Sequence, residues 1–343
     1  MKRMYVVGLL LFMISTGIHA KITRISYRGW DNCYEITNDS LKIIINASSG
    51  GRILVVKKHG INFMWEDNSI DGKDYDDYQV ESFHPDAGRF DYGPGEVTSS
   101  IHKMSWAGPW DAEIIDDYTL QISNTDEELG LLSTRKFILD TVYPFLTISL
   151  NMENITSDEK QYWFWGRTLL KNGGKLFAPL NPDSNYPDKW TRYIWGDPVT
   201  FASDPNDHGV EIVDSLFTLI PGLAENSKYG TDAKTGWMAY GYEGMIFAKT
   251  FAYFEGEPYL EDNNHIQIFY AANSGINQFI EMEPVSPAVI LQPGESYSFE
   301  ENWYVFDHQE TAEPAFDPVK AADVLFEYFK SLEIKEHKKT MRY

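Results

Sequence analysis

The sequence contains a single cysteine, Cys33, among 343 residues. One cysteine excludes both an internal disulfide and a zinc site built from cysteine ligands. A chain of this size without disulfides must be stabilised by its hydrophobic core, because no covalent cross-link restrains it. This suits a large exported bacterial protein better than a small disulfide scaffold.

Basic residues are scarce as well. Lys and Arg number 29 against 51 Asp and Glu, which gives a formal net charge of −22 at pH 7. Such a surface repels phosphate groups, so we expect no nucleic-acid partner, and anionic membranes are disfavoured. No nucleotide-binding loop or zinc-binding helix motif is present, and we expect no cofactor and no metal site. The acidic run at residues 71–77 is expected to be solvated rather than to bind calcium.

Long apolar runs are missing except near the start. Lys2 and Arg3 precede an apolar run at residues 5–13, and Ala20 stands where a cleavage site would end. This layout predicts a secretory signal peptide at 1–20 and a mature chain at 21–343, because the run is too short for a comfortable membrane span. We therefore expect export to the periplasm or the outside of a bacterial cell, with no membrane insertion after cleavage.

Strand patterns dominate the chain, and helical periodicity is nearly absent. Residues 118–123 and 146–152 alternate apolar and polar side chains, as in strands with one buried face. Other predicted strands cover residues 41–45, 53–56, 133–139, 162–170, 216–220, 236–240, 245–251, 266–271, 278–282 and 296–306. The pattern predicts an all-β fold with two large, mostly antiparallel sheets stacked in one domain.

Residues 317–335 are the exception, because their apolar side chains recur with helical spacing. The expected apolar face of this C-terminal helix consists of Val319, Ala322, Leu325, Phe326 and Phe329.

Two stretches, residues 66–110 and 181–214, are rich in Asp, Gly, Pro and aromatic residues. Loops of that length in a compact domain are usually functional or disordered, and the prolines and aromatics favour ordered loops here. Aromatic residues make up 15% of the chain. That surplus suggests faces that stack on sugars in addition to a hydrophobic core.

Several short motifs are spread along the chain: Gly29-Trp30-x-x-Cys33-Tyr34, Asn38, Gly50-Gly51-Arg52-Ile53, Gly60-x-Asn62, Ile280-Glu281-Met282-Glu283-Pro284, Leu291-x-Pro293-Gly294-Glu295 and Trp303. Over about residues 30–306 this set resembles a family of secreted bacterial proteins with a galactose mutarotase-like fold, the fold of the aldose 1-epimerases. The resemblance implies a β-supersandwich and a carbohydrate ligand, whereas the fold alone does not identify a reaction.

The resemblance also implies catalytic roles for Glu281 and His84. Epimerases of this fold place a general-base Glu in a late Glu-x-Gln motif, and Glu281 occupies that position here, with Glu283 in place of the Gln. The alternative is a structural role for Glu281 in a network with an arginine such as Arg167. The epimerases also use a His near an early Gly-Arg pair, and His84 precedes Gly88-Arg89. Their second His, on a central strand, has no counterpart within residues 163–168, which departs from ordinary mutarotase chemistry.

Substrate-binding candidates lie in or near the same segments. If Arg52, Arg89 and Arg167 converge, they would suit a uronic acid carboxylate or sugar hydroxyls; the alternative is structural pairing with acidic residues. Trp165 could stack on a sugar or belong to the core. Glu283 should share a strand face with Glu281, where the two carboxylates could share a proton, hold a cation or flank a basic side chain.

Two functions remain open from the sequence. The first is an extracytoplasmic carbohydrate-active enzyme, epimerase-like or lyase-like, with Glu281 as general base. The second is a non-catalytic carbohydrate-binding protein on the same fold. In either case the expected partner is a mono- or oligosaccharide, with an acidic sugar as one option.

Overall fold

The computed structural model describes residues 21–79, 83–94, 103–204, 206–272, 278–308, 319–327 and 330. The predicted signal peptide at 1–20 lies outside the described residues. Within them, no helix is long and apolar enough to cross a membrane.

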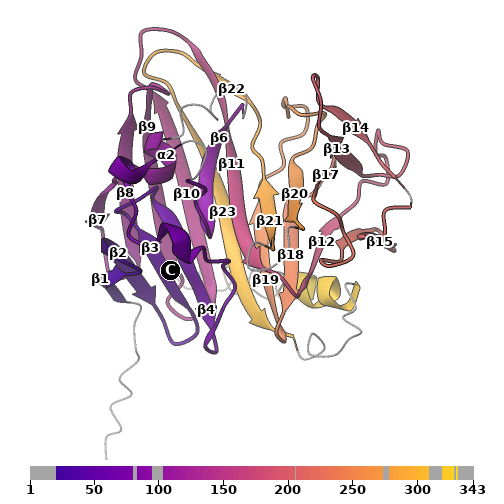
Figure 1. Ribbon diagram of the computed structural model, residues 1–343, viewed down its shortest axis with the longest axis horizontal. Helices are drawn as coiled ribbons and strands as arrows, with labels where there is room; N and C mark the ends of the chain where they lie inside the picture. Colours follow the sequence, from indigo (N-terminus) through magenta and orange to yellow (C-terminus); the bar gives the residue numbers. More distant parts are fainter. Residues whose placement is uncertain are drawn as a thin grey trace, which may run out of the picture.

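Two large antiparallel sheets make up the body of the molecule (Figure 1). The first sheet runs in the order β1 (Lys21–Tyr27), β2 (Trp30–Thr37), β3 (Lys42–Asn46), β4 (Arg52–Lys58), β6 (Gly88–Gly93), β11 (Lys160–Lys171), β21 (Phe279–Pro284), β20 (Ile266–Ala271), β17 (Ser227–Thr231), β13 (Thr191–Ile194) and β14 (Thr200–Ala202). Two short strands join it at the side, β5 (Ile61–Asn62) on β4 and β22 (Val289–Leu291) on β11.

The second sheet runs in the order β15 (Val210–Val213), β16 (Leu216–Leu219), β12 (Lys175–Pro179), β18 (Trp237–Tyr242), β19 (Met245–Phe251), β23 (Ser296–Asp307), β10 (Phe145–Asn154), β9 (Leu131–Leu139), β8 (Thr119–Asp126) and β7 (Asp111–Ile114). Among the described residues, short helices lie in the connections at η1 (Asn68–Ile70), η2 (Tyr75–Asp77) and α2 (Lys103–Ala107). The predicted all-β arrangement of two large antiparallel sheets is confirmed.

Strand β10 shows why the alternating pattern was informative. Its even-numbered side chains, from Leu146 to Met152, are buried in the core between the sheets, while the odd-numbered ones are partly exposed. The strand pairs with β9 on one side and β23 on the other, so its backbone groups are satisfied along both edges. One face of the second sheet therefore packs on the core and the other faces outward.

The two long stretches are not structureless loops. Residues 66–110 contain the fully buried strand β6, and residues 181–214 contain β13 and β14. Sequence patterning missed β6, although Arg89-Phe90-Asp91-Tyr92 alternates polar and apolar residues, because this short run lies between glycines in a stretch whose Asp, Gly and Pro content is typical of loops.

The long strand β11 determines where a ligand could bind. Phe164 and Leu170 belong to the core, and a Cβ placed on Gly166 would lie 2.1 Å from the Glu301 carboxylate of the second sheet. Since side chains alternate along a strand, Trp165 and Arg167 lie on the opposite face, away from the second sheet. That outer face of the first sheet carries the candidate site.

A buried ion pair links the two sheets beneath this face. Lys249 and Glu301 are both fully buried in the second sheet, with 3.1 Å between Nζ and Oε2. Trp303 Nε1 donates a hydrogen bond to Glu301, and Lys249 Nζ donates one to the Met282 carbonyl of β21 in the first sheet. Burial lowers the pKa of Lys249, while Glu301 opposes that shift. The pair thus fixes the second sheet against the strand that bears Glu281.

A short C-terminal helix covers the outer face of the second sheet, beside β18 and β19 (Figure 1). Residues 319–327 and 330 are helical, within the predicted range of 317–335. Ala322 and Leu325 are buried against this sheet as predicted, and Val319 packs beside them. Phe326 is half exposed and contacts Trp237 edge-on. Phe329 lies outside the described residues.

His265 gives the fold a pH dependence. Its buried ring packs against the stacked rings of Tyr253 and Tyr259, with centroids 4.8 and 5.1 Å away, and burial lowers its pKa to about 4. The unfolded chain binds the proton more readily, so stability present above about pH 6.5 is lost as the pH falls toward 4.

We expect the protonation of His265 to lower the free energy of unfolding by about 2 kcal/mol between pH 8 and pH 5. In His265→Phe, urea denaturation at the two pH values should show a difference smaller by that amount, because phenylalanine cannot be protonated. Replacing the exposed His208 by Gln provides the control and should leave the parent's pH dependence unchanged. An unaltered pH dependence in His265→Phe would contradict this account.

Candidate functional site

Six charged side chains from four strands form a continuous network on the outer face of the first sheet. We call this set the charge network: Arg89 and Asp91 on β6, Arg167 on β11, Glu281 and Glu283 on β21, and Lys228 on β17. Five of the six are no more than 6% exposed, and Arg167 is 18% exposed. Charges buried to this extent are stable only when each has an opposite partner.

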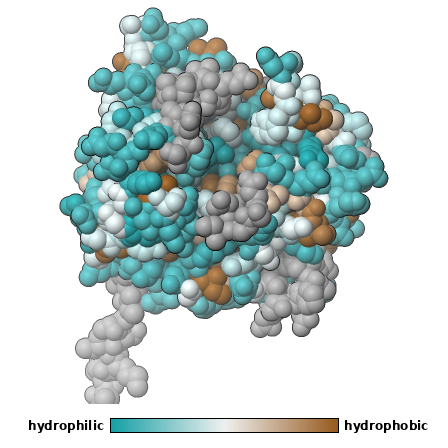
Figure 2. Space-filling view, in the orientation of Figure 1, coloured by the Kyte–Doolittle hydropathy of each residue, from teal (hydrophilic) through white to brown (hydrophobic). Residues whose placement is uncertain are grey.

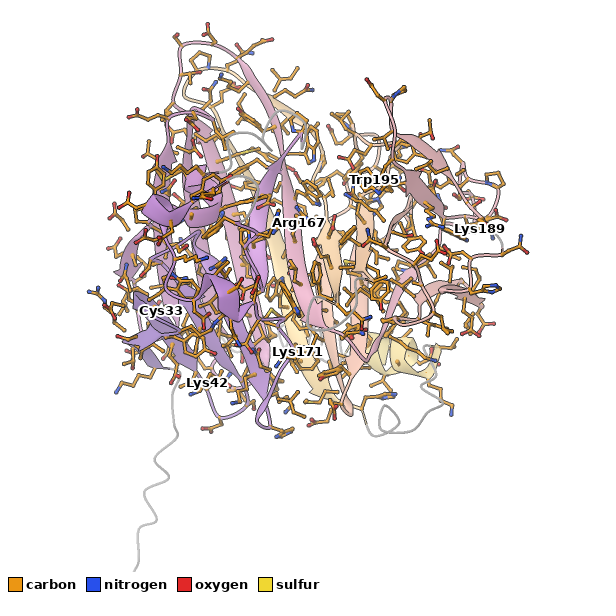
Figure 3. All side chains as sticks on the ribbon, in the orientation of Figure 1. Cys33, Lys42, Arg167, Lys171, Lys189 and Trp195 are labelled. Atoms are coloured by element: carbon orange, nitrogen blue, oxygen red, sulfur yellow. The ribbon has the colours of Figure 1, made fainter. Side chains whose placement is uncertain are left out.

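Arg167 lies at the centre of the charge network (Figure 3). Its Nε and Nη2 donate to the two carboxylate oxygens of Glu281, at 2.8 and 3.2 Å, and Nη1 is 3.5 Å from Asp91. Its Cζ lies 4.5 Å from the ring centroid of Trp165. Although burial opposes the charge, the surrounding carboxylates raise the pKa of Arg167 above its usual value. The guanidinium therefore stays charged at any accessible pH.

Glu281 and Glu283 have pKa values that move in opposite directions. Burial raises the pKa of Glu281, and the bidentate pair with Arg167 only partly offsets it. Burial would also raise the pKa of Glu283, but Lys228 at 3.2 Å and Arg167 lower it below its ordinary value. Trp165 Nε1 donates a further hydrogen bond to Glu283 at 2.8 Å. Two adjacent carboxylates with different proton affinities can take different roles in acid–base chemistry.

A pocket of about 370 Å³ opens beside the charge network, within the size range of small-molecule sites. Arg89, Arg167 and Glu281 line one part of it, and His84 lies at the same opening. The aromatic part of its lining consists of Trp65, Phe269 and Phe279, with the Trp65 and Phe279 rings 4.6 Å apart. We call this cavity the first pocket. It combines hydrogen-bonding groups with an apolar wall, as an amphipathic ligand requires.

The first pocket brings together four residues that the sequence singled out: Glu281, His84, Arg89 and Arg167. His84 is exposed, and its ring lies 6.3 Å from that of Trp106. Arg89 is held from behind by Asp91 at 3.2 Å and by a hydrogen bond to the Pro85 carbonyl.

The other predicted site residues lie elsewhere. Glu283 is fully buried behind the pocket wall, where it pairs with Lys228. Trp165 separates the charge network from a neighbouring cavity. Arg52 is fully buried at 3.6 Å from Asp86 and stacks on Trp30, away from the residues that line the first pocket. Arg52 therefore matches the alternative that the sequence left open, structural pairing with an acidic residue.

Sequence reasoning missed two members of the charge network. Asp91 follows Arg89 by two residues, so strand alternation could have placed both on one face, had β6 been recognised. Lys228 lies on β17, whose five residues are all buried and show no alternation. Its Nζ reaches Glu283 two strands away, a contact that no local pattern predicts.

The fold resembles solved structures described as galactose mutarotase-like proteins or putative aldose 1-epimerases. No known protein-family profile matches the chain, and no curated protein matches its sequence. A galactose mutarotase-like protein from Lactobacillus casei covers 80% of this chain and all of its own length, with 12% identity and a TM-score of 0.55. A putative aldose 1-epimerase from Klebsiella pneumoniae covers 85% of this chain and 84% of its own, with 11% identity and a TM-score of 0.56.

The Slr1438 protein from Synechocystis covers 87% of this chain and all of its own length, with 12% identity and a TM-score of 0.56. At these identities the likeness establishes the fold alone. The chain therefore has a galactose mutarotase-like fold, as its motifs predicted.

The charge network makes Arg167 a critical residue for stability. Arg167→Met should lower the unfolding free energy by about 3–5 kcal/mol, because it leaves buried carboxylates without their cation. Arg167→Lys should cost less, since it keeps the charge while losing the bidentate geometry. Urea denaturation at pH 7 measures both.

The matched control is Lys42→Met, which removes the partly exposed Lys42–Glu35 pair on the same sheet. That change should cost no more than about 1 kcal/mol. If Arg167→Met proved as mild as Lys42→Met, the charge network would not stabilise the strands that carry it.

Proposed function

We propose that the chain binds a sugar in the first pocket and interconverts its anomers, with Glu281 as the base. The observation that carries the proposal is the position of Glu281: a carboxylate with a raised pKa lines the same pocket as His84, on a fold similar to that of sugar epimerases. A general base works best when its pKa is raised toward the operating pH.

The reaction needs one base and one acid. Glu281 would accept the proton of the anomeric hydroxyl, and His84 would donate a proton to the ring oxygen as the bond between that oxygen and the anomeric carbon breaks. The product of this step is the open-chain aldehyde. Rotation about the adjacent carbon–carbon bond exposes the other face of the carbonyl, and the reverse proton transfers close the ring as the opposite anomer.

The charge balance favours a neutral sugar over a uronic acid. Within the charge network three cations face three carboxylates, and each cation lies within 3.2 Å of a carboxylate oxygen. A ligand carboxylate would therefore have to displace an existing partner, which costs more than hydrogen bonding to sugar hydroxyls.

A second candidate is a non-catalytic sugar-binding protein. Arg167 donates to both oxygens of Glu281 and thereby lowers its pKa, which weakens Glu281 as a base. In addition, β11 presents Trp165 and Arg167 where the epimerases use a His. The geometry of the pocket suits sugar binding by an enzyme or by a non-catalytic protein. A measurement of catalytic activity is therefore needed to distinguish these two functions.

Glu281→Gln separates these functions, because the amide keeps the shape but cannot accept the proton. We expect kcat for anomer interconversion of glucose or galactose, followed by polarimetry, to fall by about 10² to 10⁴. Binding of the same sugar, followed by tryptophan fluorescence, should stay close to that of the parent.

Glu300→Gln, on the exposed face of β23, is the matched control and should change neither measurement. Parent-like turnover in Glu281→Gln would rule out Glu281 as the base. A parent protein that binds sugar without turnover would establish the non-catalytic alternative.

We further propose that the chain acts outside the cytoplasm. The support is the basic start and the apolar run at residues 5–13, followed by Ala20. When the full chain is produced in a Gram-negative host, the periplasmic form should begin at Lys21, as determined by mass spectrometry of the intact protein. A cytoplasmic product that retains residues 1–20 would refute export.

A further inference from the structure

A second pocket of about 290 Å³ lies on the same face, and its walls are mainly aromatic. Trp163, Trp165, Tyr193, Trp195 and Phe201 line it together with Lys228. Trp195 is 61% exposed, although large aromatic side chains are normally buried. The rings of Tyr193 and Phe201 meet edge-on, 4.8 Å apart, which fixes their orientation. We call this cavity the second pocket.

The backbone makes room for one of these rings. Gly93, at the end of β6, pairs with Trp163 in the sheet, and a Cβ at Gly93 would lie 1.8 Å from the Trp163 indole. Any other residue at position 93 would push this indole away. The glycine is thus required for the position of an aromatic wall rather than for a turn.

The two pockets are neighbours on the outer face of the first sheet, where Arg167 of the first lies against Trp165 of the second. On β11, Arg167 and Leu169 line the first pocket, while Trp163 and Trp165 line the second. These four side chains alternate with core residues and so lie on one face of the strand. Asn226 and Lys228 repeat the arrangement at β17, with Asn226 in the first pocket and Lys228 in the second.

Trp165 lines the second pocket, and its ring lies against Arg167, which lines the first. Arg167 lies 4.5 Å from its ring centroid and belongs to the first pocket, while Lys228 lies 4.3 Å from the same centroid and belongs to the second. In Figure 3 the labelled Arg167 and Trp195 lie in neighbouring parts of the view, one on β11 and the other just beyond β13.

Figure 2 shows the same view as mainly hydrophilic with scattered hydrophobic patches, as expected for this acidic chain.

The second pocket has the chemistry of a sugar subsite. Its aromatic faces can cover the apolar C–H face of a sugar ring, and Lys228 and Glu261 can meet the hydroxyls at its edge. A cationic ligand is disfavoured, because the Lys228 ammonium already lies over Trp165 and at 4.9 Å from the Tyr193 ring centroid. A fully apolar ligand would cover Lys228 and Glu261 without offering them a hydrogen bond.

We propose that the two pockets are consecutive subsites, so that the preferred ligand is an oligosaccharide of at least two sugar units, whereas a single sugar occupies the first pocket alone and binds more weakly. This inference rests on the proposed sugar function of the first pocket. One unit would lie beside Glu281 and Arg167, and the next would cross Trp165 and stack among Tyr193, Trp195 and Phe201. The substrate class would then be the end of a neutral glycan chain.

The test compares single sugars with their oligomers. Isothermal titration calorimetry would be carried out on the mature chain with glucose, galactose, mannose and xylose, and with homo-oligosaccharides of two to four units of each. In at least one series we expect the dimer or trimer to bind tenfold or more tightly than the single sugar. Trp195→Ala should abolish most of that advantage and leave the affinity for the single sugar unchanged.

Phe201→Ala provides an independent second variant and should act in the same direction. Phe254→Ala, an exposed aromatic residue that lines neither pocket, is the matched control and should preserve the advantage. Thermal melting of each variant confirms that it is folded.

Three outcomes would overturn the inference, and they are distinguishable. Equal affinity for single sugars and oligomers in the parent would leave the first pocket as a monosaccharide site and remove the second subsite. Loss of both affinities in folded Trp195→Ala would mean that Trp195 belongs to the only sugar site. If no sugar in the panel bound the parent, the proposed function itself would fail.

Discussion

The burial of Arg167 among carboxylates from two neighbouring strands is the constraint on which the site depends. A buried guanidinium is tolerated only if its partners are held at hydrogen-bonding distance, and here those partners come from β6 and β21. Arg167 lies opposite Arg89 in one strand pair, and Leu169 lies opposite Glu281 in the other. A slip of one residue in either pair would turn charged side chains toward the core, so the charge network and the strand register specify each other.

The second sheet supports this arrangement from beneath. Lys249 and Glu301 satisfy each other inside the sandwich, and the hydrogen bond from Lys249 to the Met282 carbonyl reaches the strand between the two site carboxylates. β21 therefore carries polar contacts on both faces, with Glu281 and Glu283 outward and the Met282 carbonyl inward. A strand held in this way keeps its carboxylates in fixed positions, which any proton transfer to a bound sugar would require.

On the outer face, charged and aromatic side chains occupy separate regions. The charge network occupies the middle, and aromatic walls lie on either side of it: Trp65, Phe269 and Phe279 in one pocket, and the residues around Trp195 in the other. Sugars are amphipathic in the same way, with apolar ring faces and polar edges. Both proposed functions, sugar binding alone and epimerisation, fit this match. They differ in what they require of the Arg167–Glu281 pair, because only epimerisation needs Glu281 to act as a base.

The sequence alone determined the fold class and part of the site. Alternation in residues 146–152 identified a half-buried strand, because a period of two survives wherever one face meets solvent. The short motifs placed Glu281, His84, Arg89 and Arg167 in segments that the fold brings to one pocket. Only the tertiary structure revealed β6 and β17, because both are short runs with buried charged or polar residues, which a sequence pattern does not separate from a loop. It also decided that Arg52 pairs with Asp86 while Arg167 meets Glu281, 114 residues away in the chain. Which carboxylate a buried cation meets depends on sheet order and register, and these arise from contacts between strands rather than from any local pattern.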